Sequence, residues 1–465
     1  MAAEDEATDL FQSKENLNRL IEINNEGRLS QKANSSTIVG YGVNLDNIRK
    51  EIDIAVDDAD RSGHFGVFGT TRVGKTRLIE TIVEQDIKKG YNVAIFDPKG
   101  DLDLMNRVIQ TAAESGRLYD LMVLTTVFPE FSIKLDPLSH YYMEDELTDH
   151  VISGIKAKED YFIAIAQEVT QAIIAGLILQ ARCRNEKPDI SFYDVKNRSD
   201  YISLKKFGEA ISMFKGSDEI CQSISQILTS PMDFFSKVSS SLRTTLSALT
   251  TGSTGQVLGK CHQNEFVKRF EEGKGVILFC NTGSMLARRT AHLVGRVLIS
   301  MIQSMVGRFF VSGKKLNPPL CIHIDEGHNM LYRGIQELFS KGGGANCWVH
   351  FYTQSVAQIT EEVGRDAARS ILDNINTWIY MLVNHPETAQ YVEDSSPEVR
   401  AYSPLLSFGG GITIKEIKER RIKAFKVMEL NKREFYMKTY GKLFKGKTAE
   451  VHIPYVSVVL PAVKG

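Results

Sequence analysis

The sequence predicts an α/β fold in which a mostly parallel sheet comes from two separate stretches of the chain, with an all-α domain inserted between them. Short apolar runs typical of strands occur before about residue 136 and again after about residue 256, with helical patterns between successive runs. The stretch between them contains long amphipathic segments and few β-branched runs. Strands that alternate with helices form parallel sheets covered on both faces. The core is therefore predicted to be discontinuous in sequence.

The division of the chain follows these changes in pattern. We expect a polar tail or short appended helix over 1–35, the first part of a nucleotide-binding domain over 36–136, an all-α domain over 137–255 and the second part over 256–465. At 465 residues and 43% hydrophobic composition, the chain is long enough for about three domains with large cores.

Charge and cysteine content exclude several classes of protein. The formal net charge of -1 gives no global attraction to polyanions, so any nucleic-acid binding must come from local patches. The six cysteines contain no Cys-x-x-Cys pair, which favours reduced thiols over a disulfide framework or a zinc site. The acidic, polar N-terminus is not a signal peptide, and no uninterrupted apolar run of about eighteen residues predicts a membrane span.

The first strands and helix form a βαβ unit. The runs "GHFGVFG" and "YNVAIFD" flank "KTRLIETIVEQDIKKG", which has helical periodicity and ends at Gly90. The helical stretch follows, with "DYFIAIAQEVTQAIIAGLILQAR" and "DEICQSISQILTSPMDFFSKVSSSLRTTLSAL" as its clearest segments. Strands return in "GVILFCN", "PLCIHIDE", "WVHFYTQ" and "WIYMLVN".

The segment from Gly69 to Thr76 matches the phosphate-loop pattern G-x-x-x-x-G-K-[ST], with a strand before it and a helix after it. Backbone N–H groups of such a loop surround phosphate, Lys75 reaches the β/γ oxygens and the Thr76 hydroxyl ligates Mg²⁺. The predicted nucleotide-binding residues are Gly69, Thr70, Thr71, Arg72, Val73, Gly74, Lys75, Thr76 and Arg77. Arg72 and Arg77 are equally explained as solvated charges that take no part in binding.

Two adjacent acids end a later strand. Asp325 is predicted to hold Mg²⁺ and Glu326 to orient and deprotonate the attacking water, so the two motifs together indicate hydrolysis rather than binding alone. The alternative is a strand end with two solvated acids. His323 and His328 flank the pair without metal-ligand spacing, and we interpret both as structural.

Polar residues also end two further strands. Gln354 suits a γ-phosphate sensor at the carboxyl edge of the sheet, although Thr353 or Ser355 could instead cap the next helix and leave Gln354 incidental. "DPKGD", residues 97–101, is a weak signal by itself, because charged loops between strands and helices are common.

The motifs together resemble the TraG/TraD-type coupling proteins of conjugative type IV secretion systems, within the FtsK/HerA group of DNA-pumping ATPases. The resemblance rests on "GTTRVGKTR" followed by "DPKGD", then on "CIHIDEGHNM" and "FYTQSVAQI", and it extends from about His64 to the 390s. It implies a RecA-like P-loop NTPase core, with Gly69 to Thr76 as Walker A, Asp325 and Glu326 as Walker B and Gln354 as the sensor. It also implies ATP and Mg²⁺ as cofactors, and nucleotide sites shared between the subunits of a homo-hexamer. Two alternatives stay open for its assembly: the ring forms by itself, or it forms only on DNA or a membrane.

The resemblance further implies an arginine supplied by a neighbouring subunit to the γ-phosphate. Arg369 is our first candidate, with Arg288, Arg289 and Arg365 as rivals, and all four could equally be surface charges of helices. Glycines in "FSKGGGANCW" stand where a basic residue is expected beside a glycine in many relatives.

The partners expected from the resemblance are single- or double-stranded DNA, a relaxase and the secretion channel. Family members usually begin with membrane-spanning helices, so we expect either a shortened chain or recruitment by a separate membrane partner, at the cytoplasmic face of the bacterial inner membrane. The function expected is a DNA-translocating ATPase that delivers relaxase-bound single-stranded DNA to the channel. The alternatives are a type IV secretion ATPase for assembly or protein export, and a nucleotide-gated substrate-docking adaptor.

DNA contacts have two candidate places. The basic C-terminal stretch "KEIKERRIKAFKVMELNKREFYMKTYGKLFKGK" interleaves cations with five aromatic residues, Phe425, Phe435, Tyr436, Tyr440 and Phe444. The structural interpretation, in which the aromatics are core and the charges are solvated, is the favoured one. The all-α domain is the other candidate.

Overall fold

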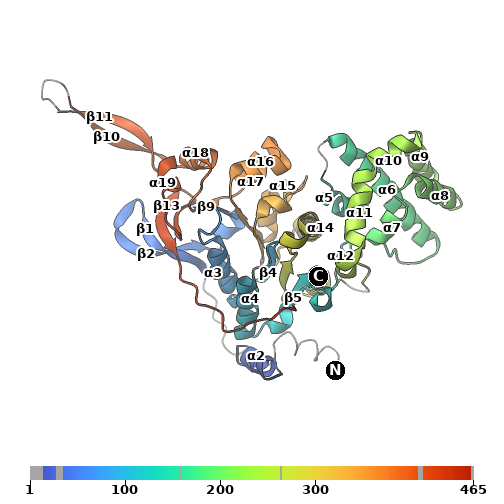
Figure 1. Ribbon diagram of the computed structural model, residues 1–465, viewed down its shortest axis with the longest axis horizontal. Coiled ribbons are helices and arrows are strands. Elements are labelled where there is room, and N and C mark those ends of the chain that lie inside the picture. The colour runs from blue at the N-terminus through green and yellow to red at the C-terminus, as the bar shows by residue number, and fades with distance from the viewer. Residues whose placement is uncertain (1–13, 28–34, 157–158, 262–263, 407–411, 462–465) are drawn as a thin grey trace.

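A computed structural model describes residues 14–27, 35–156, 159–261, 264–406 and 412–461. Its centre is an eleven-stranded mixed sheet (Figure 1). The parallel strands are β3 (Phe65–Phe68), β4 (Asn92–Asp97), β5 (Leu121–Thr125), β6 (Ile277–Asn281), β7 (Leu320–Ile324), β8 (Cys347–Thr353) and β9 (Thr377–Tyr380). The antiparallel strands at one edge are β1 (Ser36–Asn44), β2 (Asn47–Asp57), β12 (Glu434–Thr439) and β13 (Lys442–Thr448). The order across the sheet is β2-β1-β13-β12-β9-β3-β8-β7-β4-β6-β5.

The predicted α/β class and mostly parallel sheet are confirmed. All six strands predicted from apolar runs form, and they adjoin one another in the parallel part of the sheet. Strand β5 and the antiparallel edge were not predicted. The edge strands β12 and β13 come from the basic aromatic stretch and pair with each other as a hairpin.

Helices cover both faces of the sheet, and each face has its own hydrophobic core. On one face lie α2 (Lys14–Gly27), α3 (Lys75–Lys88) and α4 (Leu102–Glu114). On the other face lie α13 (Glu265–Glu271), α14 (Ser284–Val311), α15 (Gln336–Lys341), α16 (Val356–Val363), α17 (Arg365–Asp373), α18 (Pro386–Ser395) and α19 (Ala424–Met428). The strands between them are apolar and buried because both faces are covered.

The predicted insertion is helical and lies to one side of the sheet in Figure 1. Its helices are α5 (Glu144–Ser153), α6 (Asp160–Cys183), α7 (Phe192–Lys196), α8 (Tyr201–Ile211), α9 (Asp218–Ile227), α10 (Met232–Val238), α11 (Ser240–Thr250) and α12 (Gly252–Val257). These helices share a core with α14, through which the insertion is joined to the sheet.

The remaining elements are short or peripheral. The 3₁₀ turns are η1 (Asp60–Gly63), η2 (Leu118–Asp120), η3 (Pro129–Phe131), η4 (Gly327–Met330) and η5 (Gly342–Ala345). A hairpin of β10 (Glu398–Leu406) and β11 (Ile412–Arg420) projects from the body of the molecule (Figure 1). In the N-terminal stretch expected to be a tail or a short helix, residues 14–27 form α2, which packs on α4.

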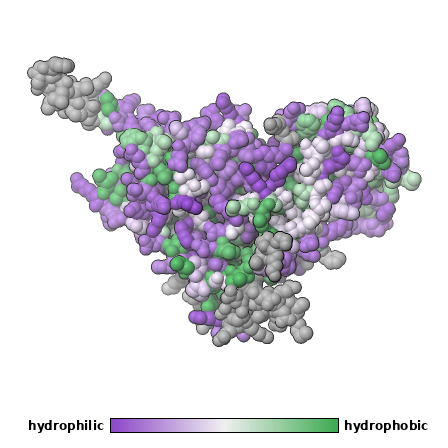
Figure 2. All heavy atoms as spheres, in the orientation of Figure 1, coloured by the Kyte–Doolittle hydropathy of each residue, from purple (hydrophilic) through white to green (hydrophobic). Residues whose placement is uncertain are grey.

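Two helices, α6 and α14, are long and apolar enough to cross a membrane by length and composition. Polar residues interrupt the apolar residues of both helices, so neither forms the uninterrupted apolar run that predicts a membrane span from sequence. Helix α14 is the central support between the sheet and the insertion, with 61% of its most apolar window buried. Core helices of globular folds pass the same test, and the face of the molecule in Figure 2 is mostly hydrophilic.

The aromatic residues of the C-terminal stretch divide into two groups. Phe435, Tyr436 and Phe444 are buried, as the structural interpretation predicts, whereas Phe425 and Tyr440 are exposed. The favoured interpretation is therefore correct for three of the five side chains.

Candidate nucleotide hydrolysis site

The predicted phosphate loop joins β3 to α3 and is fixed at its start by neighbouring strands. The backbone N–H of Gly69 donates to the Thr353 carbonyl oxygen at 3.1 Å, and that of Thr70 donates to the Leu382 carbonyl oxygen at 2.8 Å. At the end of the loop Gly74 has φ of 111°, which favours glycine because it has no Cβ. The loop thus turns directly into the N-terminus of α3, where backbone N–H groups and the helix dipole favour an anion.

Lys75 is the first residue of α3 and only 5% exposed. Its Nζ donates to the carbonyl oxygens of Gly69 at 2.6 Å and Thr70 at 2.9 Å. Burial lowers the pKa of Lys75, and the nearby carboxylates of Glu326 and Asp325 oppose that shift. The ammonium is therefore held inside the loop and close to both predicted acids, the metal ligand Asp325 and the general base Glu326.

The other predicted loop residues are placed differently from one another. The side chains of Thr71 and Arg72 are exposed, Thr76 is partly buried, and Val73 is buried in the core against α3 and α4. Arg77 donates to Glu80 and Asp103, so its guanidinium is held by carboxylates away from the loop. This arrangement supports the solvated alternative for Arg77.

The two predicted acids follow β7 at the same edge of the sheet. The backbone N–H of Asp325 donates to the Phe96 carbonyl oxygen at 3.0 Å, which continues the pairing of β7 with β4. Glu326 has φ of 46°, an uncommon value for a residue with a side chain. Both carboxylates are nearly buried, with Asp325 Oδ1 accepting the Glu326 N–H at 2.9 Å. Backbone strain of this kind concentrates at functional sites.

Gln354 follows β8, the neighbour of β7, and contacts Glu326 directly. Its Nε2 lies 3.1 Å from Glu326 Oε1 and 3.0 Å from Oε2. The next residue, Ser355, caps α16 by accepting the Gln358 N–H. Ser355 therefore caps the helix, as the alternative interpretation expects, and the Gln354 side chain is still free to contact Glu326, as a sensor requires.

Lys99, in the motif that gave only a weak signal, lies between the two acids. Its Nζ is 3.0 Å from Asp325 Oδ2 and 2.7 Å from Glu326 Oε1. Partial burial disfavours the charge, but the two carboxylates raise the pKa of Lys99. Burial alone would raise the pKa of Glu326, but the Lys99 ammonium outweighs it and the pKa of Glu326 is lowered. Lys99 therefore keeps Glu326 in the ionised form that a general base requires.

The turn that carries Lys99 is built by two aspartates. Asp97, at the end of β4, accepts the backbone N–H groups of Lys99 and Asp101, and Asp101 caps the N-terminus of α4. Burial, together with the charge of Asp325, raises the pKa of Asp97 to about 6. The spacing of "DPKGD" thus has a structural cause, which its sequence alone does not reveal.

The two histidines beside the acids have separate environments. His328 Nδ1 lies 3.2 Å from the Thr353 hydroxyl and 3.8 Å from Glu326 Oε2, at the margin of the site. His323 is fully buried farther down β7, where its Nε2 lies 3.0 Å from Asp86. His323 fits the structural role predicted for it, whereas His328 adjoins the predicted catalytic acid.

His323 and two buried neighbours, Asp86 and His350, have metal-ligand chemistry, and their ligand atoms lie within 4.8 Å of one another. Arg61 occupies the same place, because its guanidinium donates to both Asp86 oxygens at 2.6 and 2.7 Å and to His350 Nε2 at 2.9 Å. A cation is therefore already present, and we interpret the group as an ion-pair cluster.

The oxygen donors at the sheet edge fit Mg²⁺. The Thr76 hydroxyl and the Asp325 carboxylate are hard ligands of the type that Mg²⁺ prefers, usually with several retained waters. Asp325 Oδ1 accepts a hydrogen bond from the Glu326 N–H and Oδ2 accepts one from Lys99. Each carboxylate oxygen has a second acceptor position, which suits a metal-bound water.

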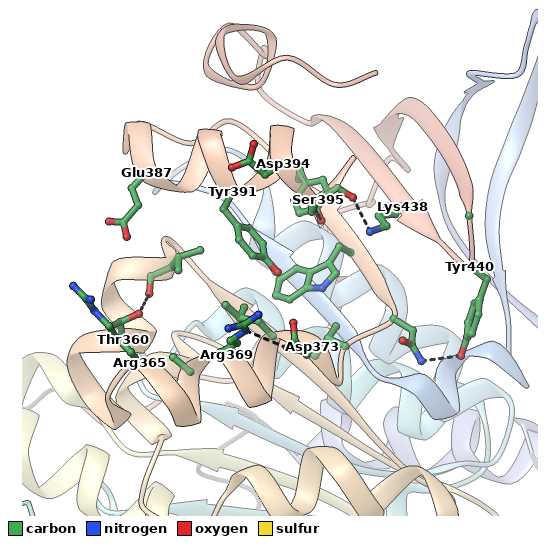
Figure 3. A pocket seen from close by; sticks show the side chains of 18 residues that line it. Thr360, Arg365, Arg369, Asp373, Glu387, Tyr391, Asp394, Ser395, Lys438 and Tyr440 are labelled. Carbon is green, nitrogen blue, oxygen red and sulfur yellow. Dashed lines mark hydrogen bonds and ion pairs between the residues drawn. The ribbon is translucent and has the colours of Figure 1, made fainter. Parts of the chain in front are cut away.

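The candidate arginines do not lie with the acids. Arg369, with 85% of its side chain exposed, pairs with Asp373 at 3.8 Å within α17. Arg365 and Arg369 line a hollow of about 730 Å³ between α16, α17, α18, β9 and β12 (Figure 3). Glu387 and Asp394 lie on its opposite side, with Tyr391 between the two groups. Arg288 and Arg289 lie on α14, in a second hollow. Exposure of these side chains suits a contact with another subunit but does not select one of them.

Comparisons with known proteins match two parts of the chain to family models. Residues 42–152 match the central domain of helicase HerA, and residues 319–395 match the TraM recognition site of TraD and TraG. The second match includes both acids, Gln354 and most of the residues that line the hollow containing Arg369. No curated protein matches the chain.

Solved structures with this fold cover nearly the whole chain. The bacterial conjugative coupling protein TrwB, in the form TrwBdeltaN70, has 15% identity and a TM-score of 0.68, covering 92% of this chain and 91% of its own. TrwB with the ATP analogue ADPNP has 14% identity and a TM-score of 0.63, covering 94% and 93%. VirB4 of Thermoanaerobacter pseudethanolicus has 11% identity and a TM-score of 0.54, covering 91% and 98%. The RecA-like fold with an all-α insertion, and the resemblance to coupling proteins, are thereby confirmed.

Proposed function

We propose that this protein is an ATP-hydrolysing motor that translocates DNA as a coupling protein of conjugative type IV secretion. The observation that carries the proposal is the meeting of Lys75, Lys99, Asp325, Glu326 and Gln354 at one edge of the sheet. The residues come from four different strand ends of the fold shared with TrwB, whose solved structures include complexes with ADPNP and with ADP and Mg²⁺.

The residues have complementary parts in hydrolysis. The loop N–H groups and Lys75 bind the β- and γ-phosphates, and Thr76 and Asp325 hold Mg²⁺, which neutralises charge on the phosphate oxygens. Glu326 accepts a proton from the water that attacks the γ-phosphorus, and the bond to the β-phosphate oxygen breaks to release ADP. Gln354, which already donates to Glu326, orients that water and reports on the γ-phosphate.

The arrangement of partners follows from the resemblance. We propose a nucleotide-binding domain formed by 36–136 and 256–465, an all-α domain over 137–255, and a homo-hexamer in which Arg369 reaches the nucleotide of the adjacent subunit. Single-stranded DNA bound to a relaxase is the proposed substrate. The match to a TraM recognition site supports docking of an accessory protein on residues 319–395. The proposed location is the cytoplasmic face of the bacterial inner membrane, next to the secretion channel.

A second function is favoured by the shared fold with VirB4, a protein whose likeness to this chain also covers most of both chains. In that case the ATPase powers assembly or protein export and does not act on DNA. A nucleotide-gated adaptor is the third function, and it predicts that Glu326→Gln retains docking of the partner protein and biological function.

Steady-state ATP hydrolysis tests the proposal, measured with and without single-stranded DNA over a range of protein concentrations. A motor with sites shared between subunits predicts a specific activity that rises steeply with protein concentration and with DNA, and that is lost in Lys75→Ala. Activity proportional to protein concentration and indifferent to DNA would overturn the motor and favour the secretion ATPase.

A further inference from the structure

A second hollow, of about 700 Å³, lies between the helical insertion and the sheet-bound helix α14. One wall is α11 with the end of α5, and the other is the N-terminal half of α14 with η4. Four cationic side chains line it, Lys156, Arg288, Arg289 and Arg296, against a single carboxylate, Glu362. We call this hollow the cationic groove.

The cations of the groove differ in their partners. Lys156 Nζ lies 2.7 Å from Glu362, and Arg296 lies 3.3 Å from the same carboxylate. Arg288 and Arg289 are exposed and have no acidic partner among the residues that the structure describes. The groove therefore keeps at least two cations available for an anionic ligand, in a chain whose net charge is only -1.

The opposite wall supplies hydroxyl groups. Ser240, Ser241, Thr244 and Thr245 line the groove from one face of α11, and Thr290 lines it from α14. Residues three and four apart share a helical face, and the leucines Leu242, Leu246 and Leu249 of the same helix are buried in the core. Arginine, lysine, serine and threonine are the side chains that contact the phosphates and sugars of nucleic acids.

The electrostatic environment of His292 agrees with this composition. Burial, followed by the charges of Arg296 and Arg288, lowers the pKa of His292 to about 4. The histidine is therefore neutral near pH 7, and the fixed positive charge of the groove comes from its arginines and its lysine.

The groove is connected to the hydrolysis site through two contacts. Arg296 Nε donates to the Asn329 carbonyl oxygen at 3.1 Å, and the Asn329 N–H donates to the Glu326 carbonyl oxygen at 2.9 Å. Glu362 lies in α16, the helix that begins directly after Gln354 and Ser355. Movement of the groove cations would therefore act on the segments that carry both Glu326 and Gln354.

We infer that the cationic groove binds the sugar-phosphate backbone of single-stranded nucleic acid and that Arg296 and Glu362 transmit its occupancy to the hydrolysis site. The inference rests on the proposed function and adds the place where the substrate is held. Arg288 and Arg289 bind phosphates, and the α11 hydroxyls donate to phosphate and sugar oxygens. Lys156 and Arg296 exchange their ion pairs with Glu362 for contacts with the phosphates of the bound strand.

Binding of a fluorescently labelled single-stranded oligonucleotide, measured by anisotropy over a range of salt concentrations, tests the groove. In the double variant Arg288→Gln/Arg289→Gln we expect weaker binding and a salt slope shallower by about 1.4, since each phosphate contact on a single strand contributes about 0.7. The matched control is Lys205→Gln/Lys206→Gln, an adjacent exposed pair on α8 that removes the same charge outside the groove. Arg288→Lys/Arg289→Lys should retain most of the affinity, which separates loss of charge from loss of fold.

Each outcome has a consequence. Equal effects of the groove and control variants would overturn the assignment of the groove as the binding site and leave the proposed DNA motor standing. Absence of oligonucleotide binding by the wild-type protein would instead contradict the proposed function itself. Competition by polyglutamate as effective as that by unlabelled oligonucleotide would overturn the nucleic-acid assignment in favour of an acidic protein.

Glu362→Gln tests the connection to hydrolysis. The variant should bind the oligonucleotide more tightly, because Lys156 and Arg296 lose their carboxylate partner, and its ATPase activity should respond less to DNA. Unchanged affinity together with an unchanged response to DNA would overturn the connection.

Discussion

Strand β7 and helix α3 build two polar clusters that contain similar groups and differ in their access to solvent. The buried cluster joins His323 to Asp86 and Arg61, whose side chains are all nearly inaccessible. The edge cluster joins Asp325, two residues after His323 and just past the end of β7, to Lys99, which is 42% exposed. Acids and cations in the interior hold the fold together, and the same groups at the open end of the strand can meet a ligand.

The pKa values reflect the same difference. Burial opposes ionisation of Asp86, but the Arg61 guanidinium holds the pKa of Asp86 well below its usual range. At the edge, Lys99 and Lys75 lower the pKa of Glu326 against the effect of its burial. Four substitutions test whether the buried cluster contributes only to the stability of the fold and whether the edge cluster contributes to ATP hydrolysis.

The largest effect on stability is expected for Arg61→Ala. It leaves the Asp86 carboxylate buried without its bidentate partner, and loss of one member of a buried pair costs about 3–5 kcal/mol. Thermal or denaturant unfolding of wild type and variant measures the change, with Arg333→Ala, whose ion pair with Asp160 is exposed on both sides, as the control. A loss below about 1 kcal/mol, the range of exposed ion pairs, would contradict a structural role for the buried cluster.

The next largest effect is expected for Gln354→Ala, this time on chemistry. Removing a donor that is aligned on the reacting groups lowers kcat by roughly 10²-fold, while the free energy of unfolding changes little because Gln354 lies at the site margin. Steady-state kinetics and unfolding should be measured on the same preparation. If the variant loses stability in proportion to activity, Gln354 supports the fold and does not serve as a sensor.

The smallest effect near neutral pH is expected for Lys99→Met. The change should lower kcat by less than about tenfold, because partly exposed ion pairs contribute about 1 kcal/mol or less. Without the ammonium the pKa of Glu326 rises, so a higher pH is needed to keep the general base ionised. The acidic limb of the profile of kcat against pH should therefore move to higher pH, and Lys99→Arg should restore it. An acidic limb that stays in place would show that Lys99 does not set the charge of Glu326.

The chemistry of the edge cluster is easier to predict from sequence than its geometry. The phosphate loop, Asp325 and Glu326 have fixed spacing and strand–helix context, so their positions followed from pattern alone. The position of Lys99 could not be predicted in this way, because it depends on the turn built by Asp97 and on the pairing of β4 with β7. The contact of His328 with Thr353 likewise depends on the adjacency of two strands that are distant in sequence.

The buried cluster could not be predicted from local pattern. Arg61 stands in "DDADRSG", a polar turn typical of an exposed segment, yet the Arg61 side chain contacts Asp86 and His350 and is 1% exposed. The antiparallel edge was missed for a related reason. Strand β13 carries three exposed lysines and β12 one partly buried lysine among buried aromatic residues, a pattern that predicts amphipathic elements without distinguishing strand from helix.

Single-turnover hydrolysis of ATP by Glu326→Gln, with ATP binding measured in parallel, tests most directly whether Glu326 is the general base of this site. Glutamine keeps the shape and can still pair with Gln354 but cannot accept the proton. We predict ATP affinity close to that of wild type and a hydrolysis rate lower by roughly 10²- to 10⁴-fold, the usual contribution of a general base. Hydrolysis at the wild-type rate by a variant that binds ATP normally would contradict the account.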